Sequence, residues 1–139
     1  MSYRILIMGL SGAGKTTLAK KIVNGLKEIQ FDVAWFNADE IRQLTNNWDF
    51  SEEGRILQAH TLRRLADKAP NDVIVVDFIA PLAQQRAIFK PHFIIWVDTI
   101  GSSQYTDTDS VFESPAHVDY YISDWDEKHE ENILELLLN

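Results

Sequence analysis

Residues 9–16 constrain the fold of this chain more than any other stretch. They read Gly-Leu-Ser-Gly-Ala-Gly-Lys-Thr and match the pattern G-x-x-x-x-G-K-[ST] at every defined position. The apolar run 3–8 precedes them, and residues 17–23 carry apolar side chains at helical spacing. A glycine loop between a strand and a helix directs backbone N–H groups, and the positive end of the helix, at an anion. We therefore predict a loop that binds a nucleoside triphosphate, and not a plain glycine turn.

Each polar residue of this loop has a predicted task. Lys15 reaches the β- and γ-phosphates and takes part in catalysis, and the Thr16 hydroxyl binds Mg²⁺. The backbone of the loop surrounds the remaining phosphate oxygens. The residues predicted to bind ATP are Gly9, Ser11, Gly12, Ala13, Gly14, Lys15, Thr16 and Thr17.

The composition narrows the classes of function. The 139 residues suit a single domain, residues 1–139, and the chain contains no cysteine for a disulfide or a thiolate metal site. No apolar run approaches the ~20 residues of a membrane helix, and the N-terminal run is interpreted as a core strand and not as a signal peptide. The net charge of −8 argues against a general nucleic-acid binder, which usually carries a basic face. We predict a cytoplasmic protein with neither a membrane nor a nucleic acid as partner.

Strands and helices are expected to alternate along the chain. The strands are predicted at 3–8, 33–36, 73–77, 93–97 and 120–122, and the helices at 14–29, 39–44, 51–68, 81–89 and 127–138. Consecutive apolar positions at 73–76 are typical of a strand buried on both faces of a parallel sheet. The polar residues 101–109 are expected to form a mobile loop. This order predicts an α/β protein with the P-loop NTPase fold, in which helices cover both faces of a five-stranded, mainly parallel sheet.

Polar side chains follow the predicted strands, at the sheet edge where such folds bind ligands. Asp77 ends the third strand and is either a Mg²⁺ ligand or an acid that caps the turn before Pro81. Asp39 follows the second strand and either orients an acceptor hydroxyl for phosphoryl transfer or caps the helix that begins there. Arg42, one helical turn later, could pair with Asp39, bind a substrate phosphate or sulfate, or lie on a solvated helix face.

Aromatic and basic residues add further candidates. Phe50 and Tyr105 lie in polar loops, where each either stacks on a nucleobase or folds onto the core. Arg55 and Arg86 are cations that could gather at phosphates in an otherwise acidic protein. The histidines show no metal-binding spacing, and Trp35 lies in a strand and is interpreted as part of the core.

Together these motifs resemble the adenylylsulfate kinase (APS kinase) family. Residues 7–19 are very similar to the phosphate loop of that family, and residues 37–42 keep the second Asp and the Arg of its Asp-Gly-Asp-Asn-x-Arg motif. The other matches follow in the family's order: 49–55 with Gly-Phe-Ser-x-x-Asp-Arg, 78–86 with Phe-Ile-Ser-Pro-x-x-x-x-Arg, 97–99 with Val-Asp-Thr, and 105–115 with Phe-Thr-Gly-Ile-Asp-x-Pro-Tyr-Glu-x-Pro. The resemblance covers nearly the whole chain.

The resemblance implies a kinase that uses ATP and Mg²⁺ to phosphorylate the ribose 3′-hydroxyl of adenylyl sulfate, giving 3′-phosphoadenylyl sulfate for sulfate assimilation. In that family the acid at the Asp39 position orients the hydroxyl. Arginines at the Arg42 and Arg55 positions hold the phosphosulfate of the substrate. Aromatic residues at the Phe50 and Tyr105 positions sandwich its adenine.

Several positions depart from the family pattern. Asn37 replaces the first Asp of the Asp-Gly-Asp motif, and Asp77 is unusual at its position. Gln58 stands where an Asn that contacts the substrate is usual, and His60 where an Arg is common. Residues 100–104 replace a longer segment that carries a basic lid in the family. A trimmed lid implies a weaker grip on ATP, slower transfer or more hydrolysis.

The resemblance also extends to the backbone and to assembly. Backbone around Ile79 and Ala80 lines the substrate pocket in the family, and related enzymes are commonly homodimers. Two alternatives stay open beside an APS kinase: a P-loop kinase for another nucleotide-like or small-molecule hydroxyl, and an ATP-binding protein with little transferase activity. A polynucleotide kinase is disfavoured by the acidic charge.

Overall fold

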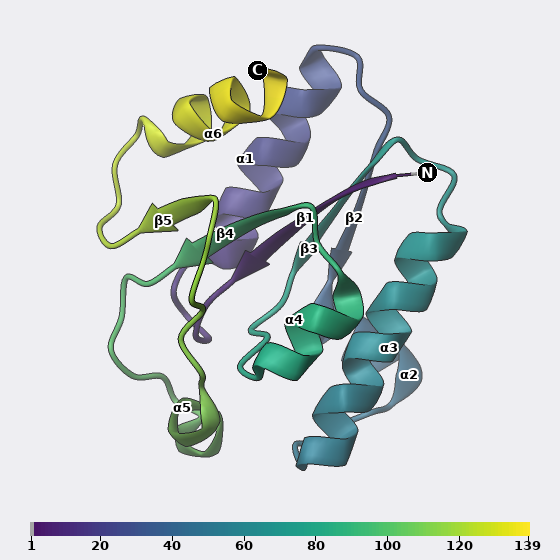
Figure 1. The fold of residues 1–139 in the computed structure, drawn as a ribbon, viewed down its shortest axis with the longest axis vertical. Coiled ribbons are helices and arrows are strands. Elements are labelled where there is room, and N and C mark those ends of the chain that lie inside the picture. Colours follow the sequence, from purple (N-terminus) through teal and green to yellow (C-terminus); the bar gives the residue numbers. More distant parts are fainter. Residues whose placement is uncertain (1) are drawn as a thin grey trace.

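A computed structural model describes residues 2–139 of the chain, and Figure 1 shows how its elements are arranged. The strands are β1 (Tyr3–Met8), β2 (Val33–Asn37), β3 (Val73–Asp77), β4 (Phe93–Val97) and β5 (Tyr120–Ile122). They form a five-stranded sheet in the order β2-β3-β1-β4-β5, and every pairing within the described residues is parallel. The predicted α/β fold with a five-stranded sheet is confirmed.

Helices cover both faces of this sheet. The helices are α1 (Lys15–Glu28), α2 (Ala38–Thr45), α3 (Glu52–Lys68), α4 (Ala83–Phe89), α5 (Thr106–Val111) and α6 (His129–Leu138). In Figure 1, α1 and α6 lie against one face, and α2, α3 and α4 against the other. The short α5 stands apart from both layers, at the lower left of the view.

The side chains of β1 show why helices cover both faces of the sheet. Ile5 and Ile7 belong to the core cluster under α1 and α6, whereas Leu6 and Met8 belong to the cluster under α2, α3 and α4. All four are buried. Because successive side chains of a strand point to opposite faces, a strand covered on both sides needs apolar residues at consecutive positions. The continuous apolar runs of the sequence therefore correctly predict strands that are covered by helices on both faces.

Two helix starts show how local side chains set the element bounds. Ser51 caps α3, because its hydroxyl accepts a hydrogen bond of 3.2 Å from the backbone N–H of Gly54. The cap of α2 is Asn37, whose side-chain oxygen accepts a bond of 2.9 Å from the backbone N–H of Glu40. The capping interpretation of Asp39 is therefore wrong, and its carboxylate is left for another role.

Gly25 lies inside α1, where glycine normally costs helix stability. A Cβ at this position would come within 2.7 Å of the Leu134 side chain on α6. The methyl group at the end of the Leu134 side chain therefore occupies the space that a side chain at residue 25 would need. The glycine therefore serves the contact between α1 and α6.

The prediction of a mobile loop over residues 101–109 is wrong in part, because α5 begins at Thr106. The Asp109 carboxylate accepts hydrogen bonds from the Ser103 backbone N–H (2.7 Å) and from the Ser103 hydroxyl (2.6 Å). These bonds fold the polar segment back on itself at the start of the helix. The polar residues of this segment form hydrogen bonds with one another. Composition alone cannot tell such residues from polar residues that are only exposed to water.

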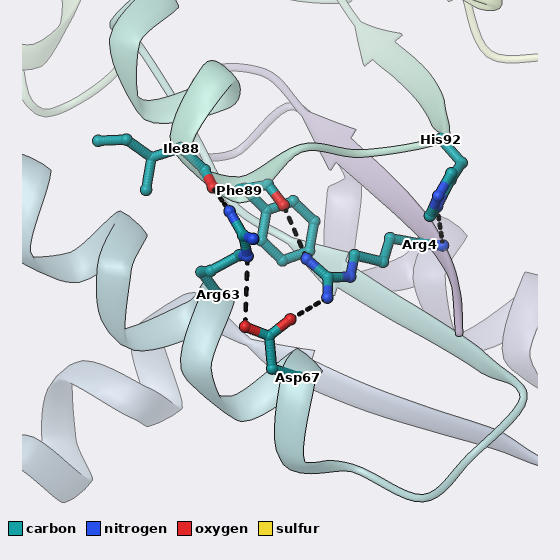
Figure 2. A network of polar contacts seen from close by, with 6 residues as sticks. All are labelled: Arg4, Arg63, Asp67, Ile88, Phe89 and His92. Carbon is teal, nitrogen blue, oxygen red and sulfur yellow. Dashed lines mark hydrogen bonds and ion pairs between the residues drawn. The ribbon is translucent and has the colours of Figure 1, made fainter. Parts of the chain in front are cut away.

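A polar network joins β1, α3 and α4 at the amino end of the sheet (Figure 2). Asp67 forms ion pairs with Arg4 and, at 3.3 Å, with Arg63. Arg4 also donates to the Phe89 carbonyl oxygen (3.2 Å), and Arg63 to that of Ile88 (3.0 Å). The network lies at the opposite end of β1 from the glycine loop, so its role is to hold the layers together.

Within residues 2–139, no helix is both long and apolar enough to cross a lipid bilayer. The longest of these helices, α3, has 17 residues and carries charged side chains along its length. A membrane-spanning helix needs about 20 predominantly apolar residues.

Candidate active site

The glycine loop connects β1 to α1 in a conformation that side chains would disturb. Gly12 and Gly14 have φ angles of 87° and 106°, in the left-handed region that favours glycine. Ala13 closes the loop, because its N–H donates to the Leu10 carbonyl oxygen (3.1 Å) and its own carbonyl accepts from the Thr99 hydroxyl (2.8 Å). The curled backbone and the N-terminus of α1 together form an anion site.

Lys15 is the buried cation of this loop. Its ammonium group donates to the Leu10 carbonyl oxygen at 3.0 Å. Burial lowers the pKa of Lys15 to about 8, although the negative charges of Asp77 and Asp39 act in the opposite direction. A buried ammonium group beside the phosphate loop is suited to a strongly anionic ligand such as a triphosphate, because the ligand's negative charge would stabilise the protonated amine that burial disfavours.

Asp77 and Thr16 lie together where β3 ends. The Thr16 hydroxyl donates to Asp77 Oδ2 at 2.7 Å, and the Asn37 amide donates to the same oxygen at 2.8 Å. Trp35 donates its indole N–H to Asp77 Oδ1 at 3.0 Å, so this tryptophan also positions an acid and is not only part of the core. A hydroxyl and a fixed carboxylate facing a phosphate loop fit Mg²⁺, which uses one or two carboxylates and takes its other ligands from phosphates and water.

No group of three or more His, Cys, Asp or Glu side chains within residues 2–139 is arranged to hold a metal ion by itself.

Two departures from the family pattern are paired in space. Asn37 and Asp77 are direct partners in the register of β2 and β3, so an Asn replaces an acid on one strand beside an added acid on the next. Asp49 and Gly54 also touch, because a Cβ at Gly54 would overlap Asp49. In the family motif the Gly and the Asp stand in the reverse order at these two positions. In each pair, one of the two neighbouring positions carries a carboxylate.

A cleft of about 480 Å³ opens from the phosphate loop along the carboxyl end of the sheet, and we name it the main cleft. The structure brings fourteen of the predicted site residues to its wall: Ser11, Gly12, Gly14, Lys15, Thr16, Thr17, Asp39, Arg42, Phe50, Arg55, Gln58, Asp77, Ile79 and Tyr105. Gly9, Ala13 and Ala80 are not among the residues that line it. The cleft therefore unites residues from across the sequence.

Asp39 faces the main cleft from the first turn of α2. The side chain is exposed, and no ion pair within residues 2–139 engages its carboxylate. Asp39 lies close enough to two cations to act on them, because its negative charge acts to raise the pKa of both Lys15 and Arg42. A free carboxylate across a cleft from a phosphate loop can accept a proton from a substrate hydroxyl.

Arg42 and Arg55 are buried in the same cleft, with 4% and 5% of their surface exposed, and neither pairs with a carboxylate in the described chain. Arg42 donates to the Asn47 carbonyl oxygen (2.8 Å), and Arg55 to the Phe50 carbonyl (2.8 Å) and to the Thr108 hydroxyl (3.2 Å). Burial lowers the pKa of both guanidinium groups. Two adjacent buried cations that form no ion pair are suited to an anionic ligand.

Phe50 and Tyr105 form a pair of facing rings at the rim of the main cleft. Their centroids are 6.5 Å apart and their planes differ by 22°. Atoms in contact lie about 3.5 Å apart, so a flat base between two rings needs about 7 Å. The guanidinium of Arg42 lies 4.5 Å from the Phe50 ring centroid, so the rings and the cations form one surface. A small adjustment of the rings would admit a nucleobase beside the anion site.

Comparison with known proteins decides the family. Residues 1–98 match the family model described as adenylylsulphate kinase. The chain belongs to the adenylylsulphate kinase family. The expected resemblance is therefore confirmed, and the matched segment includes the phosphate loop, Asp39 and both cleft arginines.

Curated relatives from several organisms agree with this assignment. The chain is 33% identical over 89 residues to the probable adenylyl-sulfate kinase of Archaeoglobus fulgidus, covering 62% of this chain and 57% of that protein. It is 28% identical over 143 residues to the adenylyl-sulfate kinase of Pseudomonas aeruginosa, covering 81% and 71%. It is also 26% identical over 87 residues to the cytidine diphosphoramidate kinase of Campylobacter jejuni, covering 63% and 51%. The chain spans about half the length of the archaeal relatives that it matches.

Solved structures show the same fold. The APS kinase of Mycobacterium tuberculosis in complex with AMPPNP and APS superposes with a TM-score of 0.83 at 20% identity, covering 99% of this chain and 98% of that one. Shikimate kinase from Acinetobacter baumannii gives a TM-score of 0.65 at 16% identity, covering 99% and 93%. The fold is therefore shared with kinases that carry different names.

Within this family member, Ala80 and Arg86 do structural work. Ala80 is fully buried with a φ angle of 48°, and its carbonyl oxygen accepts a hydrogen bond of 3.0 Å from the Arg86 side chain. Arg86 also donates to the carbonyl oxygens of Pro81 and Glu113. Because its guanidinium is occupied by backbone and lies outside the main cleft, Arg86 is not placed to bind a substrate phosphate.

The changed positions of the family pattern differ in their distance from the cleft. Gln58 lines it, but its amide N–H is engaged with the Ala38 carbonyl oxygen at 3.1 Å. His60 is exposed on α3 and does not line the main cleft.

Sequence reasoning missed several residues of the cleft. Trp48 lines it with half of its surface exposed, and it belongs to the same polar loop as Phe50, which is the signal that could have found it. Gln85 is fully buried and donates to the Arg55 carbonyl oxygen at 2.9 Å. Thr108 accepts from Arg55. No local pattern marks Gln85 or Thr108, because their roles depend on contacts between distant elements.

Proposed function

We propose that this chain transfers the γ-phosphoryl group of ATP to the 3′-hydroxyl of adenylyl sulfate. The observation that carries the proposal is the content of the main cleft, which joins a phosphate loop to two buried arginines that form no ion pair in the described chain and to a pair of facing rings. An acceptor for this cleft must combine an anionic group with a flat base. Adenylyl sulfate has both, and its hydroxyl would face the γ-phosphate.

The acceptor is held by two kinds of contact. Phe50 and Tyr105 stack on the adenine, while Arg42 and Arg55 donate to the phosphosulfate. These contacts place the ribose hydroxyl beside Asp39. Holding both reactants in line supplies much of the rate enhancement in phosphoryl transfer, because little covalent chemistry is asked of the protein.

Asp39 receives the proton of the attacking hydroxyl. As the O–H bond breaks, the hydroxyl oxygen forms a bond to the γ-phosphorus, and the bond between that phosphorus and the bridging oxygen of ADP breaks. Lys15 stabilises the negative charge on the transferring phosphoryl group. The products are ADP and 3′-phosphoadenylyl sulfate.

Thr16 and Asp77 are the residues that would hold Mg²⁺. The ion supplies positive charge that neutralises the β- and γ-phosphate oxygens. Trp35 and Asn37 keep the Asp77 carboxylate oriented toward Thr16.

A second candidate acceptor is another nucleotide joined to an anionic group. The Campylobacter relative is named for cytidine diphosphoramidate and not for adenylyl sulfate. Gln58, which replaces the usual Asn, lines the cleft, so the contacts that select the acceptor could differ from those of the family. The rings and arginines suit either acceptor, because stacking tolerates different bases.

We further infer that the enzyme works in the cytoplasm, where ATP is abundant, and that it assembles as a homodimer. A similar solved structure, 23% identical, is described as a hexameric APS kinase from Thiobacillus denitrificans, and this chain covers 28% of it. Light scattering on the purified protein would measure the mass of the assembly directly.

An acceptor panel tests the proposed substrate. Mg²⁺-dependent ADP release is measured with adenylyl sulfate, AMP, CDP and buffer alone at equal concentrations. We expect adenylyl sulfate to stimulate release at least about tenfold over AMP, because AMP lacks the sulfate that the arginines hold. Stimulation by CDP alone would favour the second candidate. Tight ATP binding with no stimulation by any acceptor would favour a nucleotide-binding protein with little transferase activity.

A further inference from the structure

A second cavity, of about 390 Å³, opens beside the phosphate loop, and we name it the Trp125 cavity. It shares Gly14 and Thr17 with the main cleft. Its other walls are Lys21 on α1 and residues 125–127, which connect β5 to α6. The two cavities therefore meet at the N-terminus of α1, the place where the loop receives phosphates.

The indole of Trp125 is fixed in position but only half covered. It packs against Gly14, since a Cβ at that residue would overlap the ring. On another side it meets His129 edge to face, with centroids 6.3 Å apart and an angle of 71°. His129 is itself held by the Tyr120 hydroxyl (2.8 Å) and the Asp124 carbonyl oxygen (2.7 Å). Even so, 48% of the Trp125 surface is exposed.

We propose that the nucleobase of the phosphate donor stacks on the indole of Trp125 and is recognised by its ring face, with little reading of its edge. This inference rests on the proposed function. In-line transfer requires the γ-phosphate to point toward the acceptor in the main cleft, near Asp39. The ribose and base of the donor must then leave the loop by another route, and the Trp125 cavity is the opening that continues from Gly14 and Thr17.

The residues that line the Trp125 cavity explain why hydrogen bonds to the edge of the base should contribute little to its recognition. Lys21, Asp126 and Glu127 are exposed to water, and one carboxylate oxygen of Asp126 already accepts the backbone N–H of Lys128 at 2.8 Å. Strong discrimination between polar ligands needs buried polar groups that are left unpaired by the wrong ligand. Stacking is tolerant, because every base has a flat aromatic face. The donor site is therefore expected to accept adenine and guanine nucleotides alike.

Calorimetric titration of the whole chain with Mg²⁺ and three ligands tests the proposal. The ligands are AMPPNP, GMPPNP and inorganic tripolyphosphate, and the variants are Trp125→Ala, Trp125→Phe and the control Phe31→Ala, which removes a half-exposed ring at the amino end of the sheet. In the parent, both nucleotides should bind within about threefold of each other and more tightly than tripolyphosphate. Trp125→Ala should weaken both nucleotides about tenfold and leave tripolyphosphate unchanged.

The remaining variants separate stacking from misfolding. Trp125→Phe keeps a flat ring and should retain most of the nucleotide affinity. Phe31→Ala should leave the affinities for all three ligands unchanged. Unchanged tripolyphosphate binding in Trp125→Ala also shows that the phosphate loop is intact.

Three results would overturn the inference while sparing the proposed function. They are equal losses for nucleotides and tripolyphosphate in Trp125→Ala, unchanged nucleotide binding in that variant, and a preference of more than about tenfold for one base in the parent. If the parent protein binds neither tripolyphosphate nor either nucleotide measurably, the assignment of the phosphate loop is overturned, and the proposed base site falls with it.

Discussion

At the scale of single residues, Asp39 separates catalysis from binding. Replacing it by Asn removes the proton acceptor but keeps the size of the side chain, so we expect Asp39→Asn to lower kcat by about a hundredfold or more. The Kd for AMPPNP should change by less than about threefold, because the carboxylate contacts the acceptor and not the triphosphate. Steady-state kinetics and calorimetry measure the two effects.

Glu40→Gln is the matched control for Asp39, because Glu40 is the next residue of α2, is exposed and does not line the main cleft. It should transfer phosphate at the parent rate. A parent-like kcat in Asp39→Asn would show that the proton goes elsewhere.

Lys15 gives the site a pH dependence in the alkaline range. Burial lowers its pKa to about 8 in the free protein, and a bound triphosphate should raise that pKa by its negative charge. Because the complex favours the protonated amine, affinity is full below about pH 8 and falls as the free protein loses the proton above it. Tripolyphosphate affinity measured from pH 7 to 9.5 should therefore drop above pH 8.

Lys15→Arg is the control for this profile, because a guanidinium stays charged throughout the range. Its affinity is expected to be lower overall but flat with pH. A parent profile that is equally flat would contradict the account in which Lys15 both titrates near pH 8 and contacts the phosphates.

The sequence predicts the residues of the phosphate loop well but those of the acceptor region less completely. Residues 9–16 form a contiguous motif whose chemistry follows from its order. Asp39 and Arg42 also follow from their place after a strand. Gln85 and Thr108 could not be found, because each acts through a contact with Arg55, which is remote in sequence. Side-chain contacts between separate elements cannot be predicted from a local sequence pattern.

At the scale of elements, α5 depends on α3 for its place beside the main cleft. Both terminal nitrogens of Arg55 donate to the Thr108 hydroxyl, and Tyr105 immediately precedes α5. Thr108→Val keeps the shape but leaves buried donors unpaired, which costs about 1–3 kcal/mol. We expect the acceptor KM to rise about threefold or more, with the Kd for AMPPNP unchanged.

Thr106→Val, on the exposed first residue of α5, is the matched control and should leave the acceptor KM unchanged. Equal kinetics in the two variants would show that α5 does not need its contact with Arg55 to hold Tyr105.

Elements with strong apolar periodicity are predicted well from the sequence, and α5 is not. The strands carry runs of apolar residues that can only be satisfied between two helical layers. By contrast, α5 is polar throughout most of its length and is held by Asp109, Ser103 and the contact between Arg55 and Thr108. A helix of 6 residues has little intrinsic stability, so tertiary contacts decide its existence.

At the scale of the whole molecule, function and stability occupy opposite ends of the sheet. The carboxyl ends of β1, β2 and β3 carry the site, while the network of Arg4, Arg63 and Asp67 joins the layers at the amino end (Figure 2). We expect Asp67→Asn to lower the free energy of unfolding by about 1 kcal/mol, because two arginines lose their shared carboxylate. Urea unfolding measures this, and ligand affinities should not change.

The same ion pairs should weaken in acid. The hydrogen bond and charge of Arg4, with a smaller contribution from Arg63, hold the pKa of Asp67 below its usual value. Its contribution is therefore complete above the unfolded pKa of about 4 and is lost as the pH falls through the lower folded value. Asp67→Asn should abolish this part of the pH dependence, whereas Glu135→Gln, an exposed acid on α6, should not.

The most direct test of the whole molecule is the product that it makes. Purified protein is incubated with Mg²⁺, ATP and adenylyl sulfate, and the nucleotides are separated by anion exchange and identified by phosphorus NMR. We predict ADP and 3′-phosphoadenylyl sulfate in equal amounts with the parent, and about a hundredfold less of both in the same time with Asp39→Asn. ADP formed without a phosphorylated adenylyl sulfate, or no turnover while ATP is bound, would contradict the assignment of adenylyl sulfate as the acceptor.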